Sequence, residues 1–437
     1  MKTGPLLDDE LDRLQADSFQ YFLDSTNARS GLVADSTREG SPSSIAAVGL
    51  GLSAYPVAVE RGLLSRGDAL RRVARTLGFL WEAEQGDSPH ATGKQGFFYH
   101  FLDMESGRRV WDCEVSTIDS AYLFAGALVA AEYFSGADPA ETRVRELAQA
   151  LYARADWNWA QNGAGAVSLG WTPEAGFQAC RWTGYNEALI LYILGLGSPT
   201  HALPPESYGA FTATYLWRTV FGIDFLFAGP LFIHQLPHTW IDFRGIQDDF
   251  MRTKGIDYFE NSRRATLVQQ RYAIENPNGY REYGPLCWGI TASEGPGPAE
   301  LEIAGERRRF FGYLARGVPD GPDDGTIAPW AAVASLPFAP EIVLPTIRHF
   351  GEIGVGKRSR YGVESTFNPT FPDSGSRSGW LSPVNLGLND GPIVLMIENY
   401  RSGLLWELTR RRVEFRRGLE AAGFRGGWLG SGTGNGV

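Results

Sequence analysis

The sequence has few cysteines and no long apolar run, and each absence excludes a class of protein. Its 3 cysteines are an odd count without a CxxC pair, which argues against a disulfide framework or a cysteine-based zinc site. No apolar run reaches the roughly 20 residues of a membrane-spanning helix. The N-terminus lacks the apolar segment of a signal peptide. We therefore expect a cytoplasmic chain, or a periplasmic or secreted one if a leader was removed.

Positive charge is also in deficit. The chain has 40 Lys and Arg against 50 Asp and Glu, a net charge of −10. Nucleic acids and anionic membranes attract clustered basic residues, so neither is expected as a partner. The oligomeric state is left open.

Several catalytic motifs are missing as well. The sequence contains no GxSxG elbow, no P-loop, no GxGxxG after a strand and no HExxH. His234 and His238 are four residues apart, but Pro237 between them disfavours a regular helix, and a metal site would also need a third ligand at a suitable spacing. We predict neither a metal site nor a cofactor.

Aromatic residues, in contrast, are abundant: 13 Trp, 17 Tyr and 25 Phe make up 13% of the 437 residues. They predict either a large aromatic core or a cleft lined with rings. Trp and Tyr suit a sugar, because an apolar ring face and a polar edge match the faces and rim of a pyranose. Composition alone leaves both interpretations open.

Helical periodicity dominates the chain. Helices are expected at residues 6–24, 43–62, 65–86, 115–135, 141–155, 186–196, 206–220, 260–274, 331–336, 340–352 and 391–421. Strand signals are few: a hairpin at 94–112 with its turn at Glu105–Gly107, and an extended piece at 361–371. No linker divides the chain. The pattern predicts an all-α fold, an (α/α)6 barrel with short β-hairpins in the loops, as one domain over residues 1–425, and a flexible Gly-rich tail at 426–437.

Two apolar helices begin among carboxylates and tryptophans. Residues 110–131 start with Asp112, Glu114 and Asp119, and residues 181–198 hold Glu187 near their start. Such acids can simply cap a helix, which stabilises it by about 0.5–2 kcal/mol. For Glu114 and Asp119 capping and catalysis are equally good explanations.

Glu187 fits catalysis better than capping. Asn186 already offers a cap, and Trp182 and Tyr185 crowd the same turn. A carboxyl beside aromatic rings loses solvation, which raises its pKa and suits it to donate a proton near neutral pH. Paired carboxyls of this kind perform glycoside hydrolysis, with retention when they are about 5–5.5 Å apart and inversion at about 6.5–9.5 Å. The candidate catalytic residues are Glu187, Asp119 and Glu114.

Candidate substrate-binding residues lie beside these acids and in later loops. They are Asp35, Trp111, Arg181, Trp182, Tyr185, Asn186, His234, His238, Trp240, Asp242, Trp288 and Trp330. Any single Trp among them belongs to the core more often than to a sugar platform.

Eight ordered segments carry a family resemblance. They include "CEVSTIDSAYLFAGAL", "RWTGYNEALILYILGLGS", "HTWIDFRGIQDDF" and "GPIVLMIENYRSGLLW". The chain resembles the glucoamylase-like glycoside hydrolases that contain bacterial endo-β-1,2-glucanases and are similar to a domain of cyclic β-1,2-glucan synthases. The resemblance spans about residues 10–420 and departs from the family pattern at Glu294, where Asp is commoner.

The resemblance implies an (α/α)6 barrel and a cofactor-free hydrolase of β-1,2-linked glucans. It implies that Glu187 is the general acid, that Glu114 and Asp119 are essential carboxylates, and that Asp35 and the 234–242 segment contact sugar. Inversion is usual among the glucanases, whereas the synthase-associated domain retains configuration. The alternatives are a transglycosylase or exo-acting glucosidase on a related glucan, and a non-catalytic glycan-binding protein.

Overall fold

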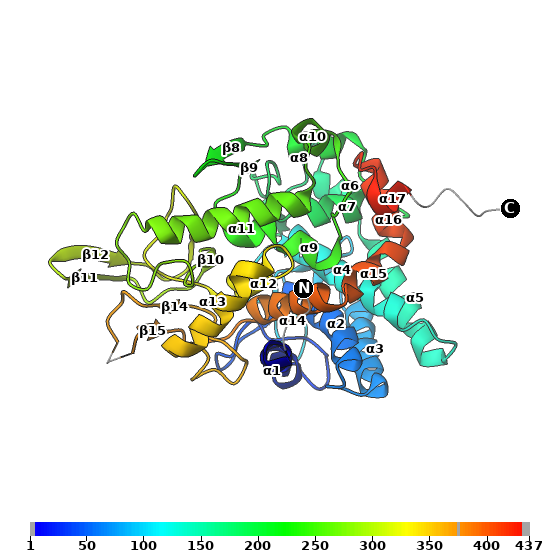
Figure 1. The fold of residues 1–437 in the computed structure, drawn as a ribbon. Coiled ribbons are helices and arrows are strands. Elements are labelled where there is room, and N and C mark those ends of the chain that lie inside the picture. Colours follow the sequence, from blue (N-terminus) through cyan, green and yellow to red (C-terminus); the bar gives the residue numbers. More distant parts are fainter. Residues whose placement is uncertain (1–4, 374–375, 431–437) are drawn as a thin grey trace. The chain divides into compact units, whose positions relative to one another are not determined.

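The computed structural model describes residues 5–373 and 376–430, and it is mostly helical with short antiparallel strand pairs (Figure 1). Its packing divides the chain into two compact units. Unit 1 comprises residues 1–21, 216–236 and 259–401, and unit 2 comprises residues 22–215, 237–258 and 402–437. Each unit is therefore assembled from three separate stretches of sequence.

Unit 2 contains the longest apolar helices. Its helices are α2 (Ile45–Glu60), α3 (Arg66–Glu82), α4 (Thr117–Tyr133), α5 (Pro139–Arg154), α6 (Trp157–Gln161), α7 (Leu189–Gly197), α8 (Glu206–Thr212), α9 (Leu236–Trp240, from Pro237), α10 (Asp249–Lys254), α15 (Leu404–Arg411), α16 (Val413–Ala421) and α17 (Gly427–Gly430). Its strands are β1 (Ser43–Ser44), β2 (Gly93–Lys94), β3 (Phe97–Tyr99), β4 (Phe101–Leu102), β5 (Val115–Ser116), β6 (Gly170–Thr172) and β7 (Gly176–Phe177).

The core of unit 2 forms where α2 packs against α4. Two glycines allow this close approach: a Cβ at Gly126 would lie 2.0 Å from the Gly49 carbonyl oxygen, and one at Gly49 would lie 2.3 Å from the Tyr122 carbonyl oxygen. Nearly every residue of both helices is buried. This explains why both sequences are apolar around their whole circumference rather than amphipathic.

Short strands fix the start of each of these helices. β1 leads directly into α2, and β5 leads directly into α4. The order β2-β3-β5-β6-β7 forms one antiparallel sheet, and β1 pairs with β4. Ser44 and Ser116 cap the two helices by accepting hydrogen bonds from backbone N–H groups. The sheet therefore positions the first turn of α4, where the acids lie.

Unit 1 consists of helices with small hairpins. Its elements are α1 (Pro5–Asp24, up to Tyr21), β8 (Trp217–Val220), β9 (Ile223–Leu226), the 3₁₀ helix η1 (Leu231–His234), α11 (Tyr258–Glu275, from Phe259), β10 (Ala292–Ser293), β11 (Ala299–Ile303), β12 (Glu306–Phe310), β13 (Leu314–Ala315), α12 (Pro329–Ala334), α13 (Pro340–Ile353), β14 (Phe367–Asn368), β15 (Trp380–Leu381) and α14 (Gly387–Arg401). The hairpin partners are β8–β9, β10–β13, β11–β12 and β14–β15.

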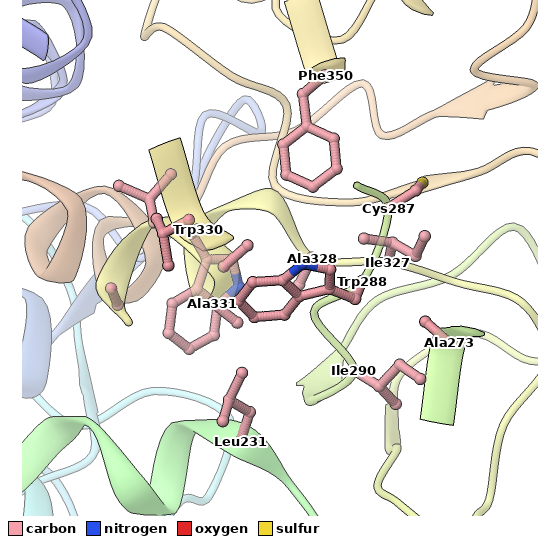
Figure 2. Packing of buried hydrophobic residues seen from close by; sticks show 14 of the residues in the cluster. Leu231, Ala273, Cys287, Trp288, Ile290, Ile327, Ala328, Trp330, Ala331 and Phe350 are labelled. Atoms are coloured by element: carbon pink, nitrogen blue, oxygen red, sulfur yellow. The ribbon is translucent and has the colours of Figure 1, made fainter. Parts of the chain in front are cut away.

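The core of unit 1 gathers around α12. Figure 2 shows Trp288 and Trp330 inside this apolar cluster, with Ile327 and Phe350 close by. Trp288 has no exposed surface and Trp330 retains 3%. Both indoles are therefore packed into the interior of their unit.

Most of the expected helices are confirmed. The structure has helices at nearly the expected bounds for 6–24, 43–62, 65–86, 115–135, 141–155, 260–274, 331–336 and 340–352. The helix expected at 186–196 begins three residues later, at Leu189, so Glu187 lies in the turn before it.

Three expectations were wrong in detail. The helix expected at 206–220 ends at Thr212, and β8 follows, because the alternating run from Trp217 pairs with β9 across the Phe221–Gly222 turn. The segment 391–421 breaks into α14 and α15 at Gly403, whose φ is +70°, and into α15 and α16 at Arg412, whose backbone is extended. Glycine adopts a positive φ without strain, and β-branched residues favour the strand at 217–220.

The third concerns the hairpin expected at 94–112. The chain does turn after Asp103, and Leu102 forms a single antiparallel bridge with Arg109. Beyond that bridge, β4 pairs with β1 and β3 pairs with β5. The extended piece expected at 361–371 contains β14. The single domain over 1–425 stays a prediction, and residues 431–437 of the expected tail lie outside the described part of the chain.

Candidate active site

Ser116 and Asp119 form one hydrogen-bonded turn at the start of α4. The Ser116 hydroxyl accepts a hydrogen bond from the Asp119 backbone N–H (3.2 Å) and donates one to the Asp119 carboxylate. Ser116 is therefore the residue that caps α4, and the Asp119 carboxylate accepts from the Ser116 hydroxyl rather than from a backbone N–H. The remaining contacts of Asp119 bear on whether it has a chemical role.

The sequence analysis missed His100, which lies between two of the predicted catalytic acids. Its Nδ1 is 3.0 Å from Glu114 Oε1, and its Nε2 is 3.7 Å from Asp119 Oδ2. The His100 backbone N–H also donates to the Glu114 carbonyl (2.9 Å). The signal that could have revealed it is the antiparallel pairing of β3 with β5, which carries the residue after β3 toward the residue before β5.

The charges in this turn stabilise one another. Burial lowers the pKa of His100. The nearby carboxylates of Asp119, Glu114 and Asp35 have the opposite and larger effect, so the pKa rises from 6.5 to about 9. Burial would raise the pKa of Glu114, but the hydrogen bond and charge of His100 lower it below its usual value. His100 is therefore an imidazolium beside the ionised carboxylate of Glu114 at neutral pH.

Glu187 has a different environment. It lies in the turn that follows Gly184, and the N-cap of α7 is Ala188, without a side-chain hydrogen bond. Burial, and secondly the negative charge of Asp119, raise the pKa of Glu187 from 4.5 to about 7. The cap-like contact instead belongs to Asn186, whose Oδ1 accepts from the Ala188 N–H (3.0 Å). Glu187 is thus a half-buried carboxyl that can carry a proton near neutral pH, close enough to Asp119 to sense its charge.

Tyr122 is a second residue that sequence reasoning missed. It lies on the same face of α4 as Asp119, three residues further along. Its ring stacks on Trp240 at 5.3 Å between centroids, and its hydroxyl is buried without a hydrogen-bond partner among the described residues. Burial, followed by the charges of Glu187 and Asp119, raises the pKa of Tyr122 well above its usual value. The site therefore contains a neutral donor held near both carboxyls.

Several predicted substrate-binding residues surround these groups in unit 2. Trp182 Nε1 donates to Thr117 Oγ1 (3.0 Å), which holds the turn before α7 against the first turn of α4. Tyr185 is mostly buried, with the rings of Tyr215 and Tyr258 each 5.8 Å away. Arg181 donates to two backbone carbonyls, so it braces the loop.

Trp111 is the most exposed of the predicted aromatic residues, at 67%. Its φ is +59°, a conformation that a bulky residue seldom adopts. The ring lies 5.0 Å from Phe101, which stacks in turn on the His100 imidazole at 4.0 Å. An exposed indole at the end of this row of rings is suited to contact a sugar.

The structure places other predicted binding residues of unit 2 in its interior. Trp240 is fully buried, and its Nε1 donates to Ser53 Oγ (2.9 Å). Asp242 has no exposed surface; Arg244 binds it through two nitrogens (2.8 and 2.7 Å), and Arg410 also pairs with it. His238 packs edge-on against Phe243. Their observed roles are packing and ion pairing, and the structure gives no support to sugar contact by them.

The same holds for three candidates in unit 1. Trp288 and Trp330 belong to the apolar cluster (Figure 2), although neither indole N–H has a partner among the described residues. His234 is buried, its Nε2 lies 3.2 Å from the Ala228 carbonyl, and burial lowers its pKa to about 4. His234 is therefore a neutral interior histidine at neutral pH.

Across residues 5–373 and 376–430, no three His, Cys, Asp or Glu side chains come together as metal ligands. Within the same ranges, every helix is too short or too polar to cross a bilayer.

Comparison with known proteins places the chain in a family. Residues 179–412 match the Glycoamylase family, described as "Putative glucoamylase". A crystal structure of the same description from Bacteroides uniformis ATCC 8492 has a TM-score of 0.86 and 31% identity, covering 98% of this chain and 100% of that one. The endo-β-1,2-glucanase from Chitinophaga pinensis, solved with sophorotriose and glucose, has a TM-score of 0.84 and 28% identity, covering 97% and 99% of the two chains.

A curated protein adds a further relative. The exo β-1,2-glucooligosaccharide sophorohydrolase (non-reducing end) of Parabacteroides distasonis is 28% identical over 96% of this chain. The chain spans 58% of the length of that relative. The predicted family is thus confirmed: this chain belongs to the glycoamylase family, which includes bacterial endo-β-1,2-glucanases.

Proposed function

We propose that this chain is a glycoside hydrolase that cleaves β-1,2-linked glucan, with Glu187 as its general acid. One observation carries the proposal. The pKa of Glu187 is raised to about 7, whereas the pKa of Glu114 is lowered by His100, which also lies 3.7 Å from Asp119. Two carboxyl environments with separated pKa values are what acid and base roles in glycoside hydrolysis require.

The reaction divides between these groups. Protonated Glu187 donates its proton to the glycosidic oxygen as the bond from that oxygen to C1 breaks. A water molecule attacks C1 and gives up a proton to an ionised carboxylate of the Glu114–Asp119 turn. The products are two shorter saccharides, and direct attack by water inverts the configuration at C1. Trp111, Asp35 and the 181–186 turn are the proposed sugar contacts in unit 2.

Two relatives support the choice of substrate. One is an endo-β-1,2-glucanase and the other an exo-acting β-1,2-glucooligosaccharide hydrolase. We propose cleavage within chains as the main activity, and release of disaccharides from non-reducing ends as the second candidate, because the exo-acting relative favours it. We also propose that the helices form a single (α/α)6 barrel domain over residues 1–425.

A substrate panel tests the proposal. The enzyme is incubated with linear β-1,2-, β-1,3-, α-1,4- and α-1,6-glucans, products are sized by chromatography, and the first anomer is identified by NMR. We expect cleavage of the β-1,2-glucan alone, with the α-anomer appearing first. Mixed oligosaccharides indicate endo cleavage, disaccharide alone indicates exo cleavage, and products longer than the substrate indicate transfer.

Glu187→Gln is the matched variant for the acid. It keeps the shape of the side chain but cannot donate a carboxyl proton, so kcat should fall by about 10²–10⁴-fold while substrate binding persists. Near-normal turnover by this variant contradicts the assignment of Glu187. Binding of β-1,2-glucan without cleavage by the unmodified protein supports a glycan-binding protein instead.

A further inference from the structure

We propose that His100 is a positioning residue for this reaction: its imidazolium bridges Glu114 and Asp119 and aims one oxygen of Asp119 at the reacting centre. The inference rests on the proposed function and adds a residue that the predicted catalytic set lacked. It also links Glu114 to Asp119, because both side chains then interact with the same cation, the His100 imidazolium.

The first argument is the geometry of the ring. Both imidazole nitrogens face a carboxylate oxygen, Nδ1 that of Glu114 at 3.0 Å and Nε2 that of Asp119 at 3.7 Å. A neutral imidazole has one N–H donor and one acceptor nitrogen, so only the protonated ring can interact favourably with both acids. The geometry therefore calls for an imidazolium.

The second argument is that the ring is held in place. The His100 N–H donates to the Glu114 carbonyl (2.9 Å), and the His100 carbonyl accepts from the Ile45 N–H (3.1 Å) at the start of α2. The ring lies nearly parallel to Phe101, at 11°. His100 is thus fixed between the segments that begin α2 and α4, and its side chain has little freedom to leave the two acids.

The third argument concerns the oxygens of Asp119. Ser116 and His100 both approach Oδ2, one by a hydrogen bond and the other across 3.7 Å. Oδ1 receives no hydrogen bond from any described residue, and the Asp119 side chain is largely buried. One oxygen is therefore anchored, and the other is left for a water molecule or a substrate hydroxyl.

The charges around His100 explain why a cation is needed. Asp35 from the loop after α1, Glu114 from the segment before β5 and Asp119 from α4 all act on it. Arg109 also lowers the pKa of Glu114, as a minor contributor. Without the imidazolium, three carboxylates would repel one another and would lose their common partner.

The test compares His100→Gln with His90→Gln, a control at an exposed histidine on the same unit. Steady-state rates on β-1,2-glucan are measured from pH 4 to pH 9. We expect His100→Gln to lower kcat by about 10²-fold or more, with KM changed far less, because Asp119 loses its fixed orientation. The acidic limb of kcat/KM should move up by about one pH unit, since the lost cation no longer lowers the pKa of Glu114.

Two outcomes overturn the proposal. One is a His100→Gln enzyme that loses thermal stability but keeps kcat and the acidic limb of the control. The other comes from NMR titration of the unmodified protein with labelled histidine: a His100 ring that is neutral at pH 7 rules out the bridge. The titration needs neither substrate nor a folded variant, so it separates a failure of this inference from a failure of the proposed function.

Discussion

Gly170 lies directly against the side chain of Glu114. The two meet because β6 pairs with β5, which places Gly170 opposite Ser116. A Cβ at Gly170 would lie 2.6 Å from Glu114 Cγ and 2.7 Å from the Val115 carbonyl oxygen. The absence of a side chain at this position gives Glu114 the room in which it reaches His100.

Gly170→Ala should therefore disturb the cluster of His100, Glu114 and Asp119, although Gly170 is not itself a member of that cluster. The added methyl group must displace either Glu114 or the strand, so we expect kcat to fall by about tenfold or more and stability to fall by about 1–3 kcal/mol. The control is Gly209→Ala in α8, where a Cβ would meet nothing within 4 Å. That variant should keep full activity and gain up to about 1 kcal/mol. Steady-state rates and urea denaturation are measured for both variants. A fully active Gly170→Ala enzyme contradicts the claim that Glu114 needs the space beside Gly170.

Glu187 should set the alkaline limit of activity. The pKa of Glu187 is raised to about 7 by burial and by Asp119. A general acid must be protonated, so kcat/KM should fall about tenfold per pH unit above that pKa. A pH profile in low-salt buffer measures this limb, and activity that stays constant up to pH 9 contradicts the assignment.

The same group should make folding stability depend on pH. Its pKa is about 7 when folded and 4.5 ordinarily, so the folded state holds this proton more tightly. The stabilising contribution is complete below pH 4.5 and is lost as pH rises through 7. Melting temperatures from pH 4 to 8 should therefore fall more steeply with rising pH for the unmodified protein than for Glu187→Gln. Parallel curves contradict the raised pKa.

Local patterns in the sequence predicted the helices and the clustered acids, because both depend on neighbouring residues. The stripes that define α3 and α13, and the Ser caps of α2 and α4, are local features. The role of His100 depends on which strands pair, and single-sequence patterns do not specify pairing between strands as short as two residues. The break at 217–220 likewise depends on a hairpin partner.

Burial was the other property that sequence patterns did not reveal. Trp240 and Trp288 look like Trp111 in the sequence, since each is flanked by polar residues or glycine. In the structure two of them are fully buried and one is 67% exposed. An indole packs equally well against a core or a sugar, so the distinction depends on long-range packing alone.

Trp111 should contribute to binding rather than to chemistry. Because its ring is exposed, Trp111→Ala should leave the melting temperature within about 2 °C of the unmodified protein. The loss of a stacking surface should raise KM for β-1,2-glucooligosaccharides by roughly 5–30-fold, with little change in kcat. Trp81→Ala is the control, because Trp81 is also exposed but lies on α3 beside Arg154. An unchanged KM in Trp111→Ala excludes the ring from the substrate site.

Asp242 should prove structural. It is fully buried, and the guanidinium groups that pair with it, those of Arg244 and Arg410, are partly exposed. Asp242→Asn removes the charge but keeps the shape, so we expect a loss of about 1–3 kcal/mol in unfolding free energy, without a change in kcat per folded molecule. Urea denaturation and active-site-normalised rates measure the two effects. A selective rise in KM at unchanged stability would instead return Asp242 to the substrate-binding set.

Removal of the Tyr122 hydroxyl should affect stability and activity in opposite directions. Its hydroxyl is buried without a partner among the described residues, while its ring stacks on Trp240. Removing an unsatisfied buried hydroxyl should leave stability unchanged or raise it by up to about 1 kcal/mol. If the hydroxyl donates to substrate or to the attacking water, Tyr122→Phe should nevertheless lower kcat/KM by about 10–100-fold.

Tyr152→Phe is the matched control. Tyr152 is buried in the same unit, and its hydroxyl donates to the Leu194 carbonyl at 2.6 Å. Breaking that bond should cost about 1 kcal/mol and leave kcat/KM unchanged. Thermal denaturation and steady-state kinetics of the two variants then give a crossed result, in which one variant is stable but slow and the other is less stable but fast. If the Tyr122→Phe enzyme has normal kinetics, the hydroxyl takes no part in the reaction.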